Sequence, residues 1–183
     1  VTNDGHGVFT TVTKRLRENS LEIARISSHL GICYGKKGDI GKQKTLLQTA
    51  ISIFEEQYGP DDEQVVKLKT NLASTHLALG EYNESLAQLE RVIPSLRSYH
   101  GESHPVLAMA YNSLGLCYRR VRRIAQAKVV LSQGIAIYRN LYEPKHIHLA
   151  PLLVNLAAVC GDLDETDQQI ELLEEANSIF TSH

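Results

Sequence analysis

Residues 69–96, KTNLASTHLALGEYNESLAQLERVIPSL, carry the pattern that decides the fold. Their apolar side chains recur at steps of three, four and seven, which places them on one face of an α-helix: Leu72, Leu79, Leu86, Leu89, Val92, Ile93 and Leu96. Gly80 interrupts this pattern, and glycine readily takes the left-handed conformation that ends a helix. The stretch therefore predicts two helices joined by a turn.

The same pattern occurs four times at an unbroken period of 42 residues, marked by Leu30, Leu72, Leu114 and Leu156. Each of these leucines is followed by a small residue: Gly31, Ala73, Gly115 and Ala157. A fixed period of this length is the signature of a repeat architecture. We expect a single domain at residues 20–183 with units at about 20–62, 63–104, 105–146 and 147–181, and a partial preceding repeat or N-terminal helix at 1–19.

The period alone also fits HEAT and armadillo repeats, but the residue pattern is more specific. Leu30-Gly31-Ile32-Cys33-Tyr34 and Leu79-Gly80-Glu81-Tyr82 resemble the tetratricopeptide repeat. The 42-residue form, with Tyr58-Gly59-Pro60-Asp61-Asp62 between units, is similar to the repeats of kinesin light chains. The resemblance implies an all-α fold, a right-handed α-solenoid of antiparallel helix pairs. The turn glycine of the pattern is replaced by Arg122 and Asp164 in the last two copies.

Composition excludes several classes of protein. The chain has 183 residues, 43% of them apolar, and a formal net charge of −2, so it lacks the basic excess typical of nucleic-acid binders. No stretch predicts a membrane span. Three widely spaced cysteines, Cys33, Cys117 and Cys160, fit reduced thiols in a cytoplasmic compartment. The start has neither Met nor a signal peptide, so we expect a piece of a longer protein.

No residue set predicts catalysis. All three cysteines fall in apolar helical patterns, so we expect buried, unreactive thiols. A phosphate-binding glycine loop is missing, which leaves no expected cofactor. The eight histidines lack the close thiolate or carboxylate neighbours of metal sites. His104-Pro105 is instead interpreted as a helix start with proline in the first turn.

The resemblance implies a concave wall of first helices that binds an extended peptide of a partner protein. Its binding positions, carried onto this chain, are Arg25, Ser28, Lys36, Lys67, Thr70, Asn71, Ser74, Asn112, Leu116, Arg119, Arg120 and Asn155. Asparagine suits this role because its amide can both donate to and accept from a peptide backbone. The alternative is that Asn71 and Asn155 bridge adjacent helices.

Charge is distributed unevenly along the repeats. Residues 108–149 carry seven basic residues and one acidic residue, whereas residues 150–183 carry seven acidic residues and no Lys or Arg. The arginines of residues 119–123 predict an acidic peptide near the third unit, since guanidinium groups bind carboxylates well. Alternatively, Arg119, Arg120 and Arg123 pair with acidic residues of the fourth unit, such as Asp162 and Glu165.

These observations predict an adaptor of the cargo or scaffold type that binds a linear, acidic peptide. Two alternatives stay open. The array could be a spacer or self-association element, because Leu172, Leu173, Ile179 and Phe180 of the last helix lack a following helix to cover them. It could also be a sensory array that regulates an effector domain elsewhere in a longer protein.

Overall fold

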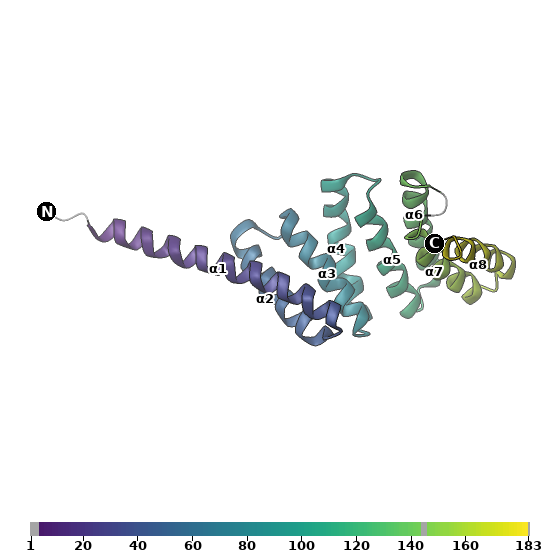
Figure 1. The fold of residues 1–183 in the computed structure, drawn as a ribbon, viewed down its shortest axis with the longest axis horizontal. Coiled ribbons are helices and arrows are strands. Elements are labelled where there is room, and N and C mark those ends of the chain that lie inside the picture. The colour runs from purple at the N-terminus through teal and green to yellow at the C-terminus, as the bar shows by residue number, and fades with distance from the viewer. Residues whose placement is uncertain (1–3, 144–145, 183) are drawn as a thin grey trace. The chain divides into compact units, whose positions relative to one another are not determined.

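The computed structural model describes residues 4–143 and 146–182, with side chains from residue 14 onward. The described residues form eight helices and no strand, which confirms the predicted all-α fold (Figure 1). They divide into two compact units, residues 1–75 and 76–183. The division falls within the predicted second repeat, inside α3 (Glu63–Ala78).

The first unit is a helix hairpin with most of α3 packed on it. α1 (Asp4–Lys37) and α2 (Ile40–Tyr58) form the hairpin. Its core joins the buried Leu47, Ala50, Ile51 and Phe54 of α2 to Ala24 of α1 and to Val65, Leu68 and Leu72 of α3. The stripe of leucines read from the sequence is therefore the seam between one helix pair and the next.

Helix α1 is longer than the repeat pattern predicts. It runs without interruption from Asp4 to Lys37, so the predicted boundary between residues 19 and 20 falls inside a helix. Residues 16–20, LRENS, occupy the register of Tyr58-Gly59-Pro60-Asp61-Asp62 but contain neither Gly nor Pro. Without those two residues nothing stops the helix at this point. Residues 1–3 of the expected partial repeat lie outside the described part of the chain.

The second unit contains α4 (Tyr82–His100), α5 (Pro105–Arg120), α6 (Ile124–Leu141), α7 (Leu149–Asp162) and α8 (Thr166–Phe180). Each helix packs on its neighbour in sequence, and α5 also contacts α7, so two first helices lie side by side (Figure 1). The small residue that follows the repeat leucine allows a close contact between helices here: a Cβ atom on Gly115 of α5 would lie only 2.5 Å from the Leu131 side chain of α6.

The turns inside the four pairs share one backbone conformation. Gly38 and Gly80 have positive φ angles of 88° and 77°, and the residues that replace them, Arg122 and Asp164, keep positive φ angles of 63° and 60°. The chain thus retains the left-handed turn after losing the glycine.

The starts of successive first helices are also capped at one register position. Asp62 accepts a hydrogen bond from the backbone N–H of Gln64 at the start of α3, and His104 does the same through Nδ1 for Val106 at the start of α5. His146 occupies the same register position and accepts from the N–H of His148, but this bond lies in the turn before α7, whose N-cap His148 has no side-chain cap bond. With Pro105 at its first turn, α5 confirms the predicted helix start, although a histidine ring supplies the cap.

Candidate functional site

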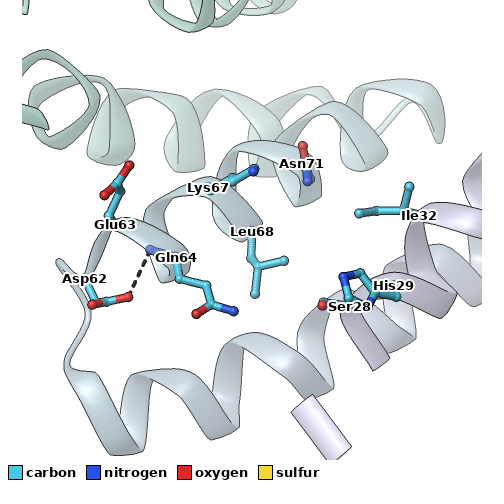
Figure 2. A pocket seen from close by; sticks show the side chains of 9 residues that line it. All are labelled: Ser28, His29, Ile32, Asp62, Glu63, Gln64, Lys67, Leu68 and Asn71. Carbon is cyan, nitrogen blue, oxygen red and sulfur yellow. Dashed lines mark hydrogen bonds between the residues drawn. The ribbon is translucent and has the colours of Figure 1, made fainter. Parts of the chain in front are cut away.

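A cavity of about 450 Å³ opens between the first helices α1 and α3 of the first unit. Helix α1 contributes Ser28, His29 and Ile32, and these face Leu68, Lys67 and Asn71 of α3 (Figure 2). Asp62, Glu63 and Gln64 line the remaining part, at the start of α3. Three residues predicted from the sequence, Ser28, Lys67 and Asn71, are therefore brought together from two successive repeats.

The polar groups of this cavity differ in whether a ligand can reach them. Ser28 donates its hydroxyl to the backbone oxygen of Arg25 at 2.8 Å. Asp62 accepts from the N–H of Gln64 at 2.9 Å, the bond drawn as a dashed line in Figure 2. Within the described residues, no side-chain hydrogen bond or ion pair engages Lys67 or Asn71. The ammonium group of Lys67 and the amide of Asn71 are therefore available to a ligand, as are the side chains of His29, Glu63 and Gln64.

Other predicted positions of the first unit do not line the cavity. Arg25 pairs with Glu22 at 3.5 Å, and Lys36 is exposed near the end of α1. The hydroxyls of Thr70 and Ser74 donate to backbone oxygens one turn earlier, at 2.8 and 3.3 Å. These two hydroxyls serve their own helix.

The cavity is also lined by five residues that were not predicted to bind a ligand: His29, Asp62, Glu63, Gln64 and Leu68. His29 lies one 42-residue period before Asn71 and could have been found from that spacing. The three polar residues at the start of α3 carry a helix-start signal, and only the fold shows that this start borders the cavity.

In the second unit the predicted asparagines contact each other. Asn155 of α7 donates its amide to the side-chain oxygen of Asn112 of α5 at 2.8 Å. The alternative interpretation of Asn155, a bridge between adjacent helices, is therefore confirmed. Leu116 is half-buried on the same helix as Asn112.

The arginine cluster divides into paired and exposed members. Arg119 forms two hydrogen bonds to the Asp162 carboxylate, at 2.6 and 3.3 Å. Arg120 lies over the Tyr82 ring, 5.7 Å from its centroid, within reach of a cation–π contact. Arg122 and Arg123 are exposed. Arg119 thus pairs with the acidic fourth repeat, which is one of the two predicted alternatives.

Two further ion pairs join the third repeat to the fourth. Lys128 reaches Glu165 at 2.5 Å, and Arg139 reaches Glu175 at 2.7 Å. The hydrogen bond from Arg119 lowers the pKa of Asp162, and that from Lys128 lowers the pKa of Glu165. Three ion pairs therefore join the basic third repeat to the acidic fourth repeat.

The prediction of three buried thiols is correct for two and wrong for one. Cys117 and Cys160 are buried, and loss of hydration raises the pKa of both thiols. Cys33 is exposed, although it occupies the same register position as Cys117. It lies on a face of α1 that has no preceding helix pair packed on it among the described residues.

In residues 4–143 and 146–182, no three His, Cys, Asp or Glu side chains gather closely enough to hold a metal ion. No helix within these described residues combines the length and the apolar content that crossing a membrane requires.

Comparison with known proteins gives a consistent result. The sequence model of the family described as "Tetratricopeptide repeat" matches residues 22–98, 65–140 and 106–182. Protein KINESIN LIGHT CHAIN-RELATED 3 of Arabidopsis thaliana is 24% identical over 153 residues, 82% of this chain and 23% of the plant protein. The clustered mitochondria protein homolog of Homo sapiens is 22% identical over 138 residues, 75% of this chain and 10% of the human protein. The chain thus spans less than a quarter of the length of these two relatives.

Solved structures show the same fold. BtubC (BKLC) from P. vanneervenii superimposes with a TM-score of 0.78 at 23% identity, covering 87% of this chain and 63% of that protein. A putative kinesin light chain from Podosopora anserina gives a TM-score of 0.69 at 19% identity, covering 87% and 75%.

Proposed function

Because the chain belongs to the tetratricopeptide repeat family, whose helix pairs serve as protein–protein interaction modules, we propose that its first unit binds a linear peptide of a partner protein. The peptide lies in the cavity between α1 and α3. One observation carries the proposal: Lys67 and Asn71 face this cavity without an intramolecular partner among the described residues.

Within the cavity, the Lys67 ammonium is the group that we assign to an acidic side chain of the peptide, because it offers three donors and a full positive charge. Two carboxylates also line the cavity: Asp62 accepts a backbone N–H, and Glu63 lies at the start of α3. Asn71 can hold the peptide backbone through both its donor and its acceptor. Leu68 and Ile32 add apolar surface for an aliphatic or aromatic anchor.

The second unit offers fewer free groups. Asn112 and Asn155 bond each other, and Asp162 neutralises Arg119. We therefore assign the peptide to the first unit, and the exposed Arg120, Arg122 and Arg123 supply only a long-range attraction for acidic ligands. In this role the chain is an adaptor module of the cargo or scaffold type.

Fluorescence polarisation with three labelled peptides tests the proposal. The peptides share one aromatic anchor and carry acidic, neutral or basic flanks. We expect micromolar binding of the acidic peptide alone, since a few charge-assisted contacts are offset by the cost of ordering the chain. The affinity should fall as salt is raised, because the contact is exposed to solvent.

Lys67→Glu should weaken this binding by about ten- to hundredfold, the equivalent of one charge-assisted hydrogen bond. Arg91→Glu is the matched control, because it makes the same change of charge at an exposed residue of α4 that does not line the cavity. Equal losses in the two variants, or no binding by any of the three peptides, would refute the cavity as the binding site.

A further inference from the structure

The first unit shows how one helix pair joins the next. Leu47, Ile51 and Phe54 of α2 pack against Val65, Leu68 and Leu72 of α3. All six side chains are buried, with no more than 7% of their surface exposed. This junction joins the second helix of one repeat to the first helix of the following repeat.

The two ends of the array expose the two halves of the same junction. Leu173 and Phe180 of α8 lie in the register of Leu47 and Phe54, yet they are 43% and 52% exposed. Ile23, Ile26 and Leu30 of α1 lie in the register of Val65, Leu68 and Leu72, and they are 53%, 52% and 44% exposed. Five of the six apolar side chains of this junction therefore have apolar counterparts at opposite ends of the sequence, and the sixth, Ile51, corresponds to Asn177.

Charge complements the apolar match. In the register of the internal junctions, residues 21–37 of α1 carry three basic residues and one acidic residue, whereas α8 carries four acidic residues and no Lys or Arg. Two such helices attract each other, while two copies of either one repel.

One polar pair at an internal junction has counterparts at both ends of the array. At the junction between α4 and α5, Tyr118 donates its hydroxyl to Glu90 at 2.8 Å. Tyr34 lies two 42-residue periods before Tyr118, and Glu174 lies two periods after Glu90. The α1 and α8 ends thus carry the same tyrosine and glutamate in the same register as this internal pair. The other two junctions have Gln48 with His76 and Ser132 with Cys160 at these positions.

We propose that the chain associates head to tail, with the α8 face of one copy packed on the α1 face of a second copy in the geometry of its own internal junctions. Leu173 and Phe180 cover Ile23, Ile26 and Leu30, and Glu174 accepts a hydrogen bond from Tyr34 of the second copy. The interface is heterologous, so each copy keeps one free α1 face and one free α8 face. Association therefore continues with concentration instead of stopping at a dimer.

Sedimentation velocity over a concentration series tests this association. The wild-type chain should show a sedimentation coefficient that rises with concentration. Leu173→Asp with Phe180→Asp blocks the α8 face, and Ile23→Asp with Ile26→Asp blocks the α1 face. Each double variant should be monomeric, and circular dichroism should show unchanged helicity because all four side chains are largely exposed. Val129→Asp, at a 58% exposed residue of α6, is the control and should associate like the wild type.

Mixing the two double variants distinguishes this interface from a symmetric one. The mixture retains one intact face of each kind, so it should form a one-to-one dimer and nothing larger. A symmetric α1–α1 or α8–α8 interface would instead let one variant dimerise alone, and that result would overturn the proposal. A wild-type monomer at every concentration would also overturn it, and would assign the two faces to other segments of a longer protein.

A cross-link gives an independent test of register. At the internal junction, the Sγ atom of Cys117 lies 3.2 Å from the Oγ atom of Ser85. The corresponding residues at the proposed interface are the exposed Cys33 of one copy and Gln169 of the other. Gln169→Cys should therefore give, under mild oxidation, a ladder at multiples of 20.4 kDa that dithiothreitol removes. The same ladder after adding Cys33→Ser, or no ladder with Cys33 present, would contradict the register.

Discussion

Two residues hold a backbone conformation that suits glycine better. Arg122 and Asp164 have positive φ angles at the turn position that Gly38 and Gly80 occupy in the first two helix pairs. For a residue with a Cβ atom the left-handed region is strained by roughly 1–2 kcal/mol, less for Asp, whose short polar side chain bonds locally. Arg122 is therefore the more strained of the two.

Arg122→Gly should raise the free energy of unfolding by about 0.5–1 kcal/mol, because relief of strain exceeds the added flexibility of the unfolded chain. The midpoint of urea unfolding measures the change. The same substitution within a helix, Arg91→Gly in α4, should lower stability by about 1 kcal/mol. A loss of stability in Arg122→Gly would show that the arginine side chain stabilises this turn by more than its backbone strain.

For some single residues, the burial or the binding partner could not be predicted from the sequence. The repeat predicted that Leu30 and Cys33 belong to a buried stripe, because their counterparts in later copies do. Both are exposed, since burial of a first helix depends on the preceding helix pair as well as on its own residues. Similarly, one charge pattern predicted both a ligand site and an ion pair at Arg119. Only the distance to Asp162 distinguishes them.

At the scale of elements, the 42-residue period located the helix pairs and their turns, because helix faces and glycine positions are local properties of the sequence. The length of α1 was not predicted. The sequence predicted a partial preceding repeat or an N-terminal helix at residues 1–19, but a boundary between helices requires a stop signal, and LRENS provides none. The cavity between α1 and α3 likewise depends on the packing of two helices and could be predicted only in part, at Ser28, Lys67 and Asn71.

Ion pairs between elements make the second unit sensitive to acid. The pKa values of Asp162 and Glu165 are lowered in the folded state by Arg119 and Lys128. The unfolded chain therefore takes up protons first as the pH falls below the ordinary values of 3.8 and 4.5. The stabilisation is present above these values and is lost as the pH falls through the folded pKa values.

Asp162→Asn combined with Glu165→Gln should consequently flatten the acid side of the stability curve. Urea unfolding between about pH 2.5 and 6 measures this, and the difference between variant and wild type should shrink in high salt because both carboxylates are solvent-accessible. Glu171→Gln with Glu174→Gln, at exposed acidic residues of α8, is the control and should keep more of the wild-type slope at protein concentrations too low for association. An unchanged slope in the first pair would mean that these ion pairs do not stabilise the fold.

At the scale of the whole molecule, packing is local in sequence. Among the described residues, helices that pack on each other are either neighbours along the chain or separated by one helix. The stability of such an array is close to a sum of terms for single repeats and for nearest neighbours. A substitution that destabilises one part of the core should therefore destabilise mainly the helices that form it.

Phe54→Ala tests this locality. Phe54 is 1% exposed in the core of the first unit, and its truncation should cost about 3–5 kcal/mol there. Native-state hydrogen exchange should then show faster exchange of backbone amides in α1, α2 and the start of α3, while the amides of α6 to α8 keep wild-type protection. Leu131→Ala, at a 1% exposed residue of α6, should give the opposite distribution. Uniform loss of protection in both variants would contradict nearest-neighbour stability and show that the chain unfolds as one cooperative body.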